Sequence, residues 1–211
     1  MQNSTDHFFP ELENYIQQII PQPELIDDER KKILSEISEF IAAKINSGKE
    51  ANLLVVCVHN SRRSHFAQVW AQVGADYFGI KNFKSFSGGA EATAVHPNTI
   101  AALQRAGFVI TSAKNIHEAS FSKSVSSLKL ISKIFDDEEN PKNNFGAVLV
   151  CVNDAQACPY IPDADVRIGL PYIDPKSFDG TVEEVSAYDL CCKTIASEMF
   201  WVMKEAAETI G

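Results

Sequence analysis

Apolar and polar residues follow two different periods beyond residue 50. Short apolar runs with the length of buried strands alternate with longer segments whose apolar residues recur at helical spacing. Strands that alternate with helices in this way form a parallel sheet. The predicted strands are residues 51–58, 83–86, 145–152 and 166–170, and the alternation over 128–135 also fits a strand. The predicted helices are residues 64–73, 97–106 and 190–207.

This pattern divides the chain into two parts. Residues 51–211 predict an α/β domain with an open parallel sheet of about four strands and helices on both faces. Residues 1–50 predict an N-terminal helical extension, whose first helix ends at the prolines of 21–23. Its second helix carries an apolar stripe made of Ile33, Leu34, Ile37, Phe40, Ile41 and Ile45. The stripe must be buried, so we expect it to pack on the main domain, with a dimerisation arm as the alternative.

Composition excludes several classes of function. The 211 residues carry a net charge of −9, which argues against nucleic acid or an anionic membrane as the main partner. No apolar run approaches the ~18 residues of a membrane span, and the first residues lack the pattern of a signal peptide. Five cysteines are too few and too unevenly spaced for a secreted disulfide scaffold. We therefore expect a cytoplasmic enzyme with reactive thiols.

The clearest chemistry follows the first predicted strand. Cys57 ends an apolar run, five residues intervene, and Arg63 and Ser64 open an amphipathic segment. Backbone N–H groups of a loop curled against a helix N-terminus bind anions, and the same positive potential favours a thiolate. The predicted oxyanion-binding loop consists of Val58, His59, Asn60, Ser61, Arg62, Arg63 and Ser64.

Each side chain of this loop has an expected role. Arg63 can meet a tetrahedral oxyanion with two parallel hydrogen bonds. Ser64 can donate its hydroxyl to the sulfur of Cys57, and Asn60 tolerates the left-handed backbone of a tight loop. The alternative is a buried free cysteine followed by a basic turn. The strand, motif and helix context favours the anion site.

Two further cysteines lie beyond the third main strand. Cys151 ends that strand, six residues follow, and Cys158 precedes a proline. These thiols allow three interpretations: structural cysteines, a metal pair, or redox partners of Cys57. Zinc would need two more ligands, and none lies at a useful spacing, so no metal site is predicted. Parallel strands gather Cys57, Ser87 and Cys151 at one edge of the sheet, which favours exchange between thiols.

A candidate general acid follows the last strand. Asp174, fixed by Pro175, could protonate a leaving oxygen if it lies near the Cys57 loop. The alternative is an ordinary Asp-Pro turn, a common loop element. Taken alone, the Asp-Pro motif favours an ordinary turn. The Cys57 loop elsewhere in the chain favours the interpretation of Asp174 as a general acid.

The loop at 57–64 resembles the catalytic loop of the low-molecular-weight protein tyrosine phosphatase family, which includes the thioredoxin-coupled arsenate reductases. The segments 87–97 and 151–159 resemble the arsenate reductase branch. The likeness covers roughly residues 52–208 and implies a flavodoxin-like sheet. Two features depart from the family pattern. Arg62 stands where a small residue or cysteine is usual, and Lys176-Ser177 replaces the aromatic residue that grips a phenol ring.

The resemblance implies a reaction. Arsenate bound by the loop is attacked by Cys57, Asp174 acts as the acid, and Cys151 and Cys158 are resolving thiols recycled by thioredoxin. No bound cofactor or metal is implied. The first alternative is a phosphatase that hydrolyses phosphotyrosine or aryl phosphates through a Cys57 phosphoenzyme. The second is a non-catalytic module that binds oxyanions or senses redox state.

Overall fold

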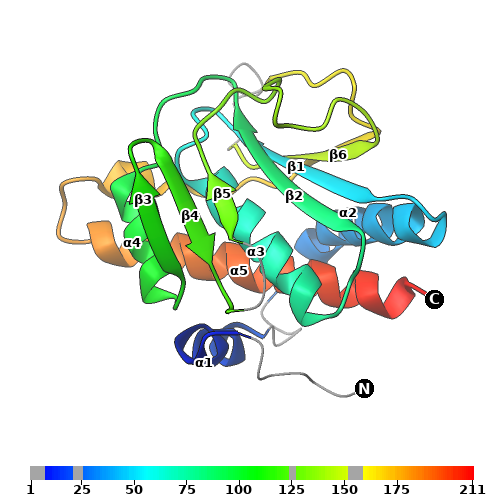
Figure 1. Ribbon diagram of the computed structural model, residues 1–211, viewed down its shortest axis with the longest axis horizontal. Helices are drawn as coiled ribbons and strands as arrows, with labels where there is room; N and C mark the ends of the chain where they lie inside the picture. Colours follow the sequence, from blue (N-terminus) through cyan, green and yellow to red (C-terminus); the bar gives the residue numbers. More distant parts are fainter. Residues whose placement is uncertain (1–7, 21–25, 124–126, 152–158) are drawn as a thin grey trace.

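The computed structural model describes residues 8–20, 26–123, 127–151 and 159–211 (Figure 1). The elements in chain order are α1 (Pro10–Ile19), α2 (Asp28–Asn46), β1 (Ala51–Cys57), α3 (Arg63–Tyr77), β2 (Phe83–Gly89), α4 (Pro97–Arg105), β3 (Val109–Ala113), β4 (Ile116–Ser120), β5 (Leu128–Leu130), β6 (Phe145–Leu149), β7 (Val166–Gly169), the 3₁₀ helix η3 (Pro175–Phe178) and α5 (Glu184–Thr209). No helix within these ranges is long and apolar enough to cross a membrane.

The main sheet has four parallel strands in the order β2-β1-β6-β7. This sheet confirms the predicted α/β fold. Cys57 pairs with Gly89, and Val56 pairs with Leu149, so the carboxyl ends of three neighbouring strands meet at one edge. Cys57 and the segment that leads to Cys151 therefore lie at the same edge, as the strand pattern predicts.

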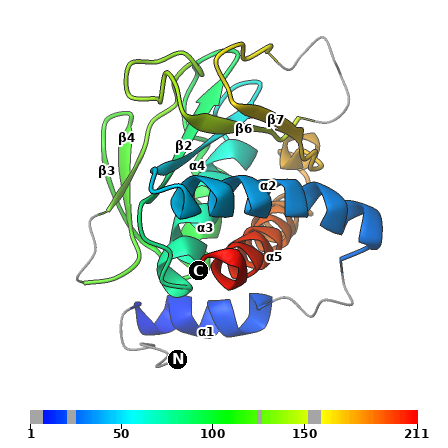
Figure 2. The ribbon, with the colours of Figure 1, turned by 90° about the vertical axis from the view of Figure 1, so that its right-hand side faces the viewer.

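The two faces of the sheet are covered differently. Leu53 and Val55 point to the large core shared with α2, α3 and α5, whereas Leu54 and Val56 belong to a smaller cluster on the opposite face. Figure 2 shows α2 and α5 below β6 and β7, with α1 beneath them. The prediction of helices on both faces thus holds for one face only among the described residues. The other face is covered by irregular segments that insert Phe135 and Ile161, because the charged, turn-rich stretch before β6 offers no amphipathic helix.

A second, antiparallel sheet of three strands, in the order β3-β4-β5, was not predicted. The residues of β3 are mostly exposed, so it lacks the apolar run that identifies a buried strand. A turn at Lys114, with φ of 55°, joins β3 to β4. The alternation over 128–135 does give a strand, but β5 is short and joins this sheet rather than the main one.

The N-terminal helices pack on the main domain, as expected. Leu34, Ile37 and Ile41 of α2 are fully buried in the large core against α5. The first helix comes so close to the α4–β3 turn that a Cβ on Gly107, at φ of 101°, would lie 2.2 Å from the backbone of Leu12. One core therefore joins both parts, and the domain boundary at residue 50 stays a prediction.

Candidate functional site

The loop between β1 and α3 turns its carbonyl groups outward. The carbonyl oxygens of residues 57–61 each accept a hydrogen bond from a donor beyond the loop. The donors are the N–H of Ala90 to the carbonyl of Cys57, the N–H of Glu91 to that of Val58, and the hydroxyls of Thr93 and Ser132 to that of His59. The carbonyl of Asn60 accepts from Nε2 of His65, and that of Ser61 accepts from the N–H of His96 and the hydroxyl of Thr99. In a planar trans peptide, the N–H points opposite to the C=O. The N–H groups of residues 58–62 therefore face the hollow of the loop, which is the arrangement of an anion site.

Asn60 fixes the shape of this loop. Its φ of 44° is left-handed, as expected. Its side-chain Oδ1 accepts a hydrogen bond from the backbone N–H of Lys133 at 2.9 Å, and its Nδ2 donates to Ser64 Oγ at 2.9 Å. The loop is thereby tied both to the segment after β5 and to the start of α3.

Cys57 and Ser64 are in contact at the base of the loop. The sulfur of Cys57 lies 3.1 Å from Oγ of Ser64, and both residues are buried. Because Nδ2 of Asn60 already donates to this oxygen, the hydroxyl proton of Ser64 is free to point at the sulfur. A hydrogen bond of this kind stabilises negative charge on the sulfur.

Arg63 is buried and donates hydrogen bonds to the segments that follow β6 and β7. Its Nη1 donates to the carbonyl oxygens of Val150 at 3.1 Å and Tyr172 at 3.0 Å, and its Nη2 donates to Oδ2 of Asp174 at 2.5 Å. Its Nε is buried and has no hydrogen-bond partner among the residues that the structure describes. A buried N–H donor is costly to leave unpaired, so this atom is available to a bound oxyanion.

Asp174, the predicted acid, contacts Arg63, and Cys151, a predicted resolving thiol, follows a residue that does so. Asp174 caps η3 by accepting a hydrogen bond from the N–H of Lys176 at 3.0 Å on Oδ1, which leaves Oδ2 to Arg63. Cys151 is half-buried and directly follows Val150, whose carbonyl oxygen binds Arg63. Cys158 lies outside the described residues.

His65 is a site-supporting residue that the sequence analysis did not single out. It is fully buried; Nε2 contacts the carbonyl oxygen of Asn60 at 2.8 Å, and Nδ1 lies 3.3 Å from Oγ of Ser87. Burial lowers the pKa of His65 to about 4, so the ring is neutral at pH 7. The proton sits on Nε2, where it can be donated to the Asn60 carbonyl. Its position directly after the motif was the only signal in the sequence.

Arg62 was predicted to belong to the oxyanion-binding loop, but its side chain leaves the loop. Its Nε donates to the hydroxyl of Tyr188 at 2.6 Å, and its Nη2 donates to Oδ2 of Asp179 at 3.0 Å. Neither partner was singled out from the sequence, because both lie more than a hundred residues away in the chain. Only the backbone of Arg62 contributes to the loop.

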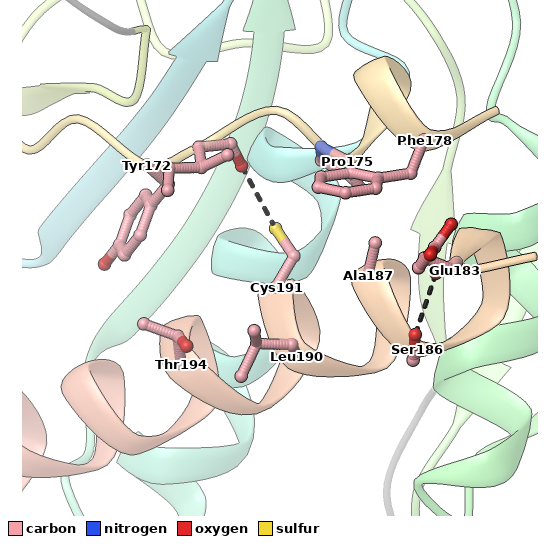
Figure 3. A pocket seen from close by; sticks show the side chains of 10 residues that line it. Tyr172, Pro175, Phe178, Glu183, Ser186, Ala187, Leu190, Cys191 and Thr194 are labelled. Atoms are coloured by element: carbon pink, nitrogen blue, oxygen red, sulfur yellow. Dashed lines mark hydrogen bonds between the residues drawn. The ribbon is translucent and has the colours of Figure 1, made fainter. Parts of the chain in front are cut away.

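A mostly apolar pocket of about 530 Å³ lies between residues 172–178 and α5 (Figure 3). Its wall is formed by Tyr172, Ile173, Pro175, Phe178, Glu183, Ser186, Ala187, Leu190, Cys191 and Thr194. Cys191 points from α5 towards the segment that carries Pro175, and burial raises the pKa of its thiol to about 12. The apolar lining does not suit an oxyanion, and this thiol is not a nucleophile at neutral pH.

No cluster of three or more His, Cys, Asp or Glu side chains that could hold a metal occurs in the described parts of the chain. The donors around the loop are N–H groups, which bind anions and not cations.

A loop of inward N–H groups, a cysteine at its base, a buried arginine and an adjacent carboxylate together define a cysteine-centred oxyanion site on a parallel α/β sheet. No protein-family profile matches the chain. It is 29% identical to the arsenate reductase of Bacillus subtilis over 155 residues, which is 73% of this chain and 93% of that protein. It is also 29% identical to the arsenate reductase of Halalkalibacterium halodurans over 129 residues, 61% and 77% of the two chains.

Among solved structures, a low-molecular-weight phosphotyrosine phosphatase from Vibrio cholerae matches with a TM-score of 0.48 at 13% identity, covering 74% of this chain and 96% of that one. In sequence, the chain is therefore similar to arsenate reductases over 61% to 73% of its length.

Proposed function

We propose that this protein reduces arsenate to arsenite through a relay of three cysteines. The observation that carries the proposal is the loop 57–64, in which outward carbonyls, the Cys57–Ser64 contact and the unpartnered Nε of Arg63 form a site for a tetrahedral oxyanion. The similarity to arsenate reductases favours arsenate among the oxyanions. The acidic surface does not oppose this, because the positive potential is local to the loop.

In the first step, the thiolate of Cys57 attacks arsenic and forms an S–As bond. One As–O bond breaks, and the departing oxygen takes a proton from Asp174. The N–H groups of the loop and Nε of Arg63 stabilise the negative oxygens that remain. This step is the same for phosphate esters, where the leaving group is an alcohol.

In the second step, the thiolate of Cys151 attacks the sulfur of Cys57. The S–As electron pair passes to arsenic, which leaves as arsenite in the trivalent state, and a Cys57–Cys151 disulfide remains. Cys158 then attacks the sulfur of Cys151, which frees Cys57 and forms a Cys151–Cys158 disulfide. The dithiol of thioredoxin supplies the two electrons that reduce this disulfide. Such a cycle needs the reducing cytoplasm, where we place the protein.

The alternative is hydrolysis of aryl phosphates through a Cys57 phosphoenzyme. Its support is that Cys57, Arg63 and Asp174 suffice for it, without the other two thiols. The residues after Asp174-Pro175 are Lys176 and Ser177, and Lys176 is mostly exposed. A phenol ring thus lacks the aromatic partner that the family usually provides there, which favours arsenate.

Steady-state oxidation of NADPH by arsenate, thioredoxin and thioredoxin reductase tests the proposal. We expect arsenate-dependent turnover that disappears in Cys57→Ser and in Cys158→Ser. The variant Cys191→Ser is the matched control, because it removes a thiol that the relay does not use. Brisk aryl-phosphate hydrolysis without NADPH oxidation would establish the phosphatase instead. Absence of both activities would favour the non-catalytic binding module.

A further inference from the structure

Two adjacent arginines hold the two ends of one short segment. Arg63 binds Asp174, the residue that precedes η3, and Arg62 binds Asp179, the residue that follows it. The N–H of Asp179 also donates to the carbonyl oxygen of Lys176 at 3.1 Å, which closes the single turn of η3. The acid segment, defined as residues 174–179, is thus fixed to the start of α3 at both ends.

The contacts of Arg62 are suited to a permanent anchor. Its side chain is 10% exposed, and Asp179 is 31% exposed. The hydroxyl of Tyr188 receives the hydrogen bond from Arg62 and donates its own proton to Oδ1 of Asp179 at 2.7 Å. Charged groups that are largely removed from water and share hydrogen bonds hold one geometry better than exposed ion pairs.

His96 connects the contacts of Arg62 and Tyr188 to the oxyanion loop. The ring of His96 stacks on that of Tyr188, with centroids 5.3 Å apart, and its backbone N–H donates to the carbonyl oxygen of Ser61 at 3.0 Å. Nδ1 of His96 accepts from the N–H of Asn98 and caps α4. Burial and the charge of Arg62 lower the pKa of His96, which keeps this acceptor unprotonated at pH 7.

We propose that Arg62 is a positioning residue that sets the acid segment against the oxyanion loop, so that Asp174 lies where the leaving group departs. Arg63 holds only the Asp174 end of the segment, through its Nη2, because its Nη1 binds two backbone carbonyls and its Nε faces the bound oxyanion. The other end is held by Arg62. The proposal rests on the proposed function in one respect, namely that Asp174 is the general acid. It assigns a purpose to an arginine that departs from the pattern of the family.

The first test needs no activity. Hydrogen exchange is followed in the peptides that cover residues 174–181 of the full chain, in Arg62→Ala and in the control Arg105→Ala. Arg105, at the end of α4, forms an ion pair with Asp189 of α5, and within the part of the chain that the structure describes none of its side-chain hydrogen bonds reaches residues 174–179. We expect exchange in this segment to rise about 10-fold or more in Arg62→Ala, since its anchor is lost, and to stay unchanged in the control. Equal protection in both variants overturns the proposal.

The second test measures proton delivery. A phenyl phosphate needs the acid more than a p-nitrophenyl phosphate, whose leaving group is already a stable anion. We expect kcat/KM of Arg62→Ala to fall about 10- to 100-fold on phenyl phosphate and much less on p-nitrophenyl phosphate. A misplaced general acid loses part of its contribution to catalysis, and only the first substrate depends on that contribution. A loss of the same size on both substrates overturns the positioning role.

Two milder variants keep the test decisive if Arg62→Ala does not fold. Arg62→Lys retains the positive charge but offers a single nitrogen in place of the guanidinium fork, so it should recover part of the phenyl phosphate activity. Tyr188→Phe should show the Arg62→Ala pattern in weaker form. If the wild-type protein turns over neither arsenate nor aryl phosphates, the proposed function fails, whereas hydrogen exchange still decides whether Arg62 fixes the segment.

Discussion

Nη2 of Arg63 donates a hydrogen bond to Oδ2 of Asp174 across 111 residues of sequence. This contact joins the residue at the N-terminus of α3 to the carboxylate that precedes η3. It places a carboxyl group beside the oxyanion loop, which is the position that the proposed role of Asp174 requires.

Asp174→Asn tests that role. The amide can keep the cap on Lys176 N–H, so the fold should survive, but it cannot give a proton to the leaving oxygen. We expect kcat/KM on phenyl phosphate to fall about 10²- to 10⁴-fold, the usual contribution of general acid catalysis. Asp189→Asn removes a carboxylate that pairs with Arg105; it serves as the control and should stay near wild type. Near-wild-type kcat/KM in Asp174→Asn would remove Asp174 from the mechanism.

Ser64→Ala should weaken the nucleophile. The change removes the hydrogen bond to the sulfur of Cys57 and leaves Nδ2 of Asn60 without its partner. Since a hydrogen bond to a charged group contributes about 1.5–3 kcal/mol, we expect Cys57 to react with iodoacetamide at pH 7 about 10- to 100-fold more slowly. Ser186→Ala removes an exposed hydroxyl that donates to the carbonyl oxygen of Glu183, just before α5, and should have no effect. Undiminished alkylation in Ser64→Ala would contradict the role of the hydroxyl.

His65 should make the fold sensitive to acid. Burial lowers its pKa to about 4 from 6.5, so the unfolded state binds more protons between these values. The stability that depends on the neutral ring is complete above pH 6.5 and is lost as the pH falls towards 4. Between pH 7.5 and pH 5 we expect this group alone to remove about 2 kcal/mol from the free energy of unfolding.

Urea unfolding of the wild type and of His65→Gln at the two pH values measures this effect. The glutamine amide can still donate to the Asn60 carbonyl but does not titrate, so the variant should lose less stability on acidification. Equal losses in both proteins would show that another group is responsible.

Gly89 should be intolerant of any side chain. A Cβ on this residue would lie 2.7 Å from the backbone nitrogen of Asn60 and 2.8 Å from the carbonyl oxygen of Val58. Gly89→Ala must therefore push the oxyanion loop out of place, and we expect loss of both oxyanion binding and about 1–3 kcal/mol of stability. At Gly169, the last residue of β7, a Cβ meets nothing within 4 Å, so Gly169→Ala is the matched control. Phosphate protection of Cys57 from alkylation reports binding, and retained protection in Gly89→Ala would refute the prediction.

Much of the site could be predicted because its parts are local. The spacing of Cys57, Arg63 and Ser64 places them at a strand end and a helix start, and the contact between Cys57 and Ser64 spans only seven residues. The parallel sheet follows from the alternation of apolar runs and helical segments. By contrast, two features could not be predicted. Helices cover only one face of the main sheet among the described residues because irregular segments cover the other, and the strands of β3-β4-β5 are largely exposed. Neither irregular segments nor exposed strands leave a periodic signal in the sequence.

The sequence by itself determined the loop, the sheet that carries it and the candidate thiols, because short-range spacing and hydrophobic period fix these features. Only the tertiary structure decided where Arg62 reaches, how Asp174 meets Arg63, and which ring supports Asn60. These contacts join segments far apart in the chain, and a side chain's partner at such a distance depends on how the helices and strands pack. The position of Tyr188 is therefore set by the packing of α5 against α3, and that of Asp179 by the segment that precedes α5, which no local pattern encodes.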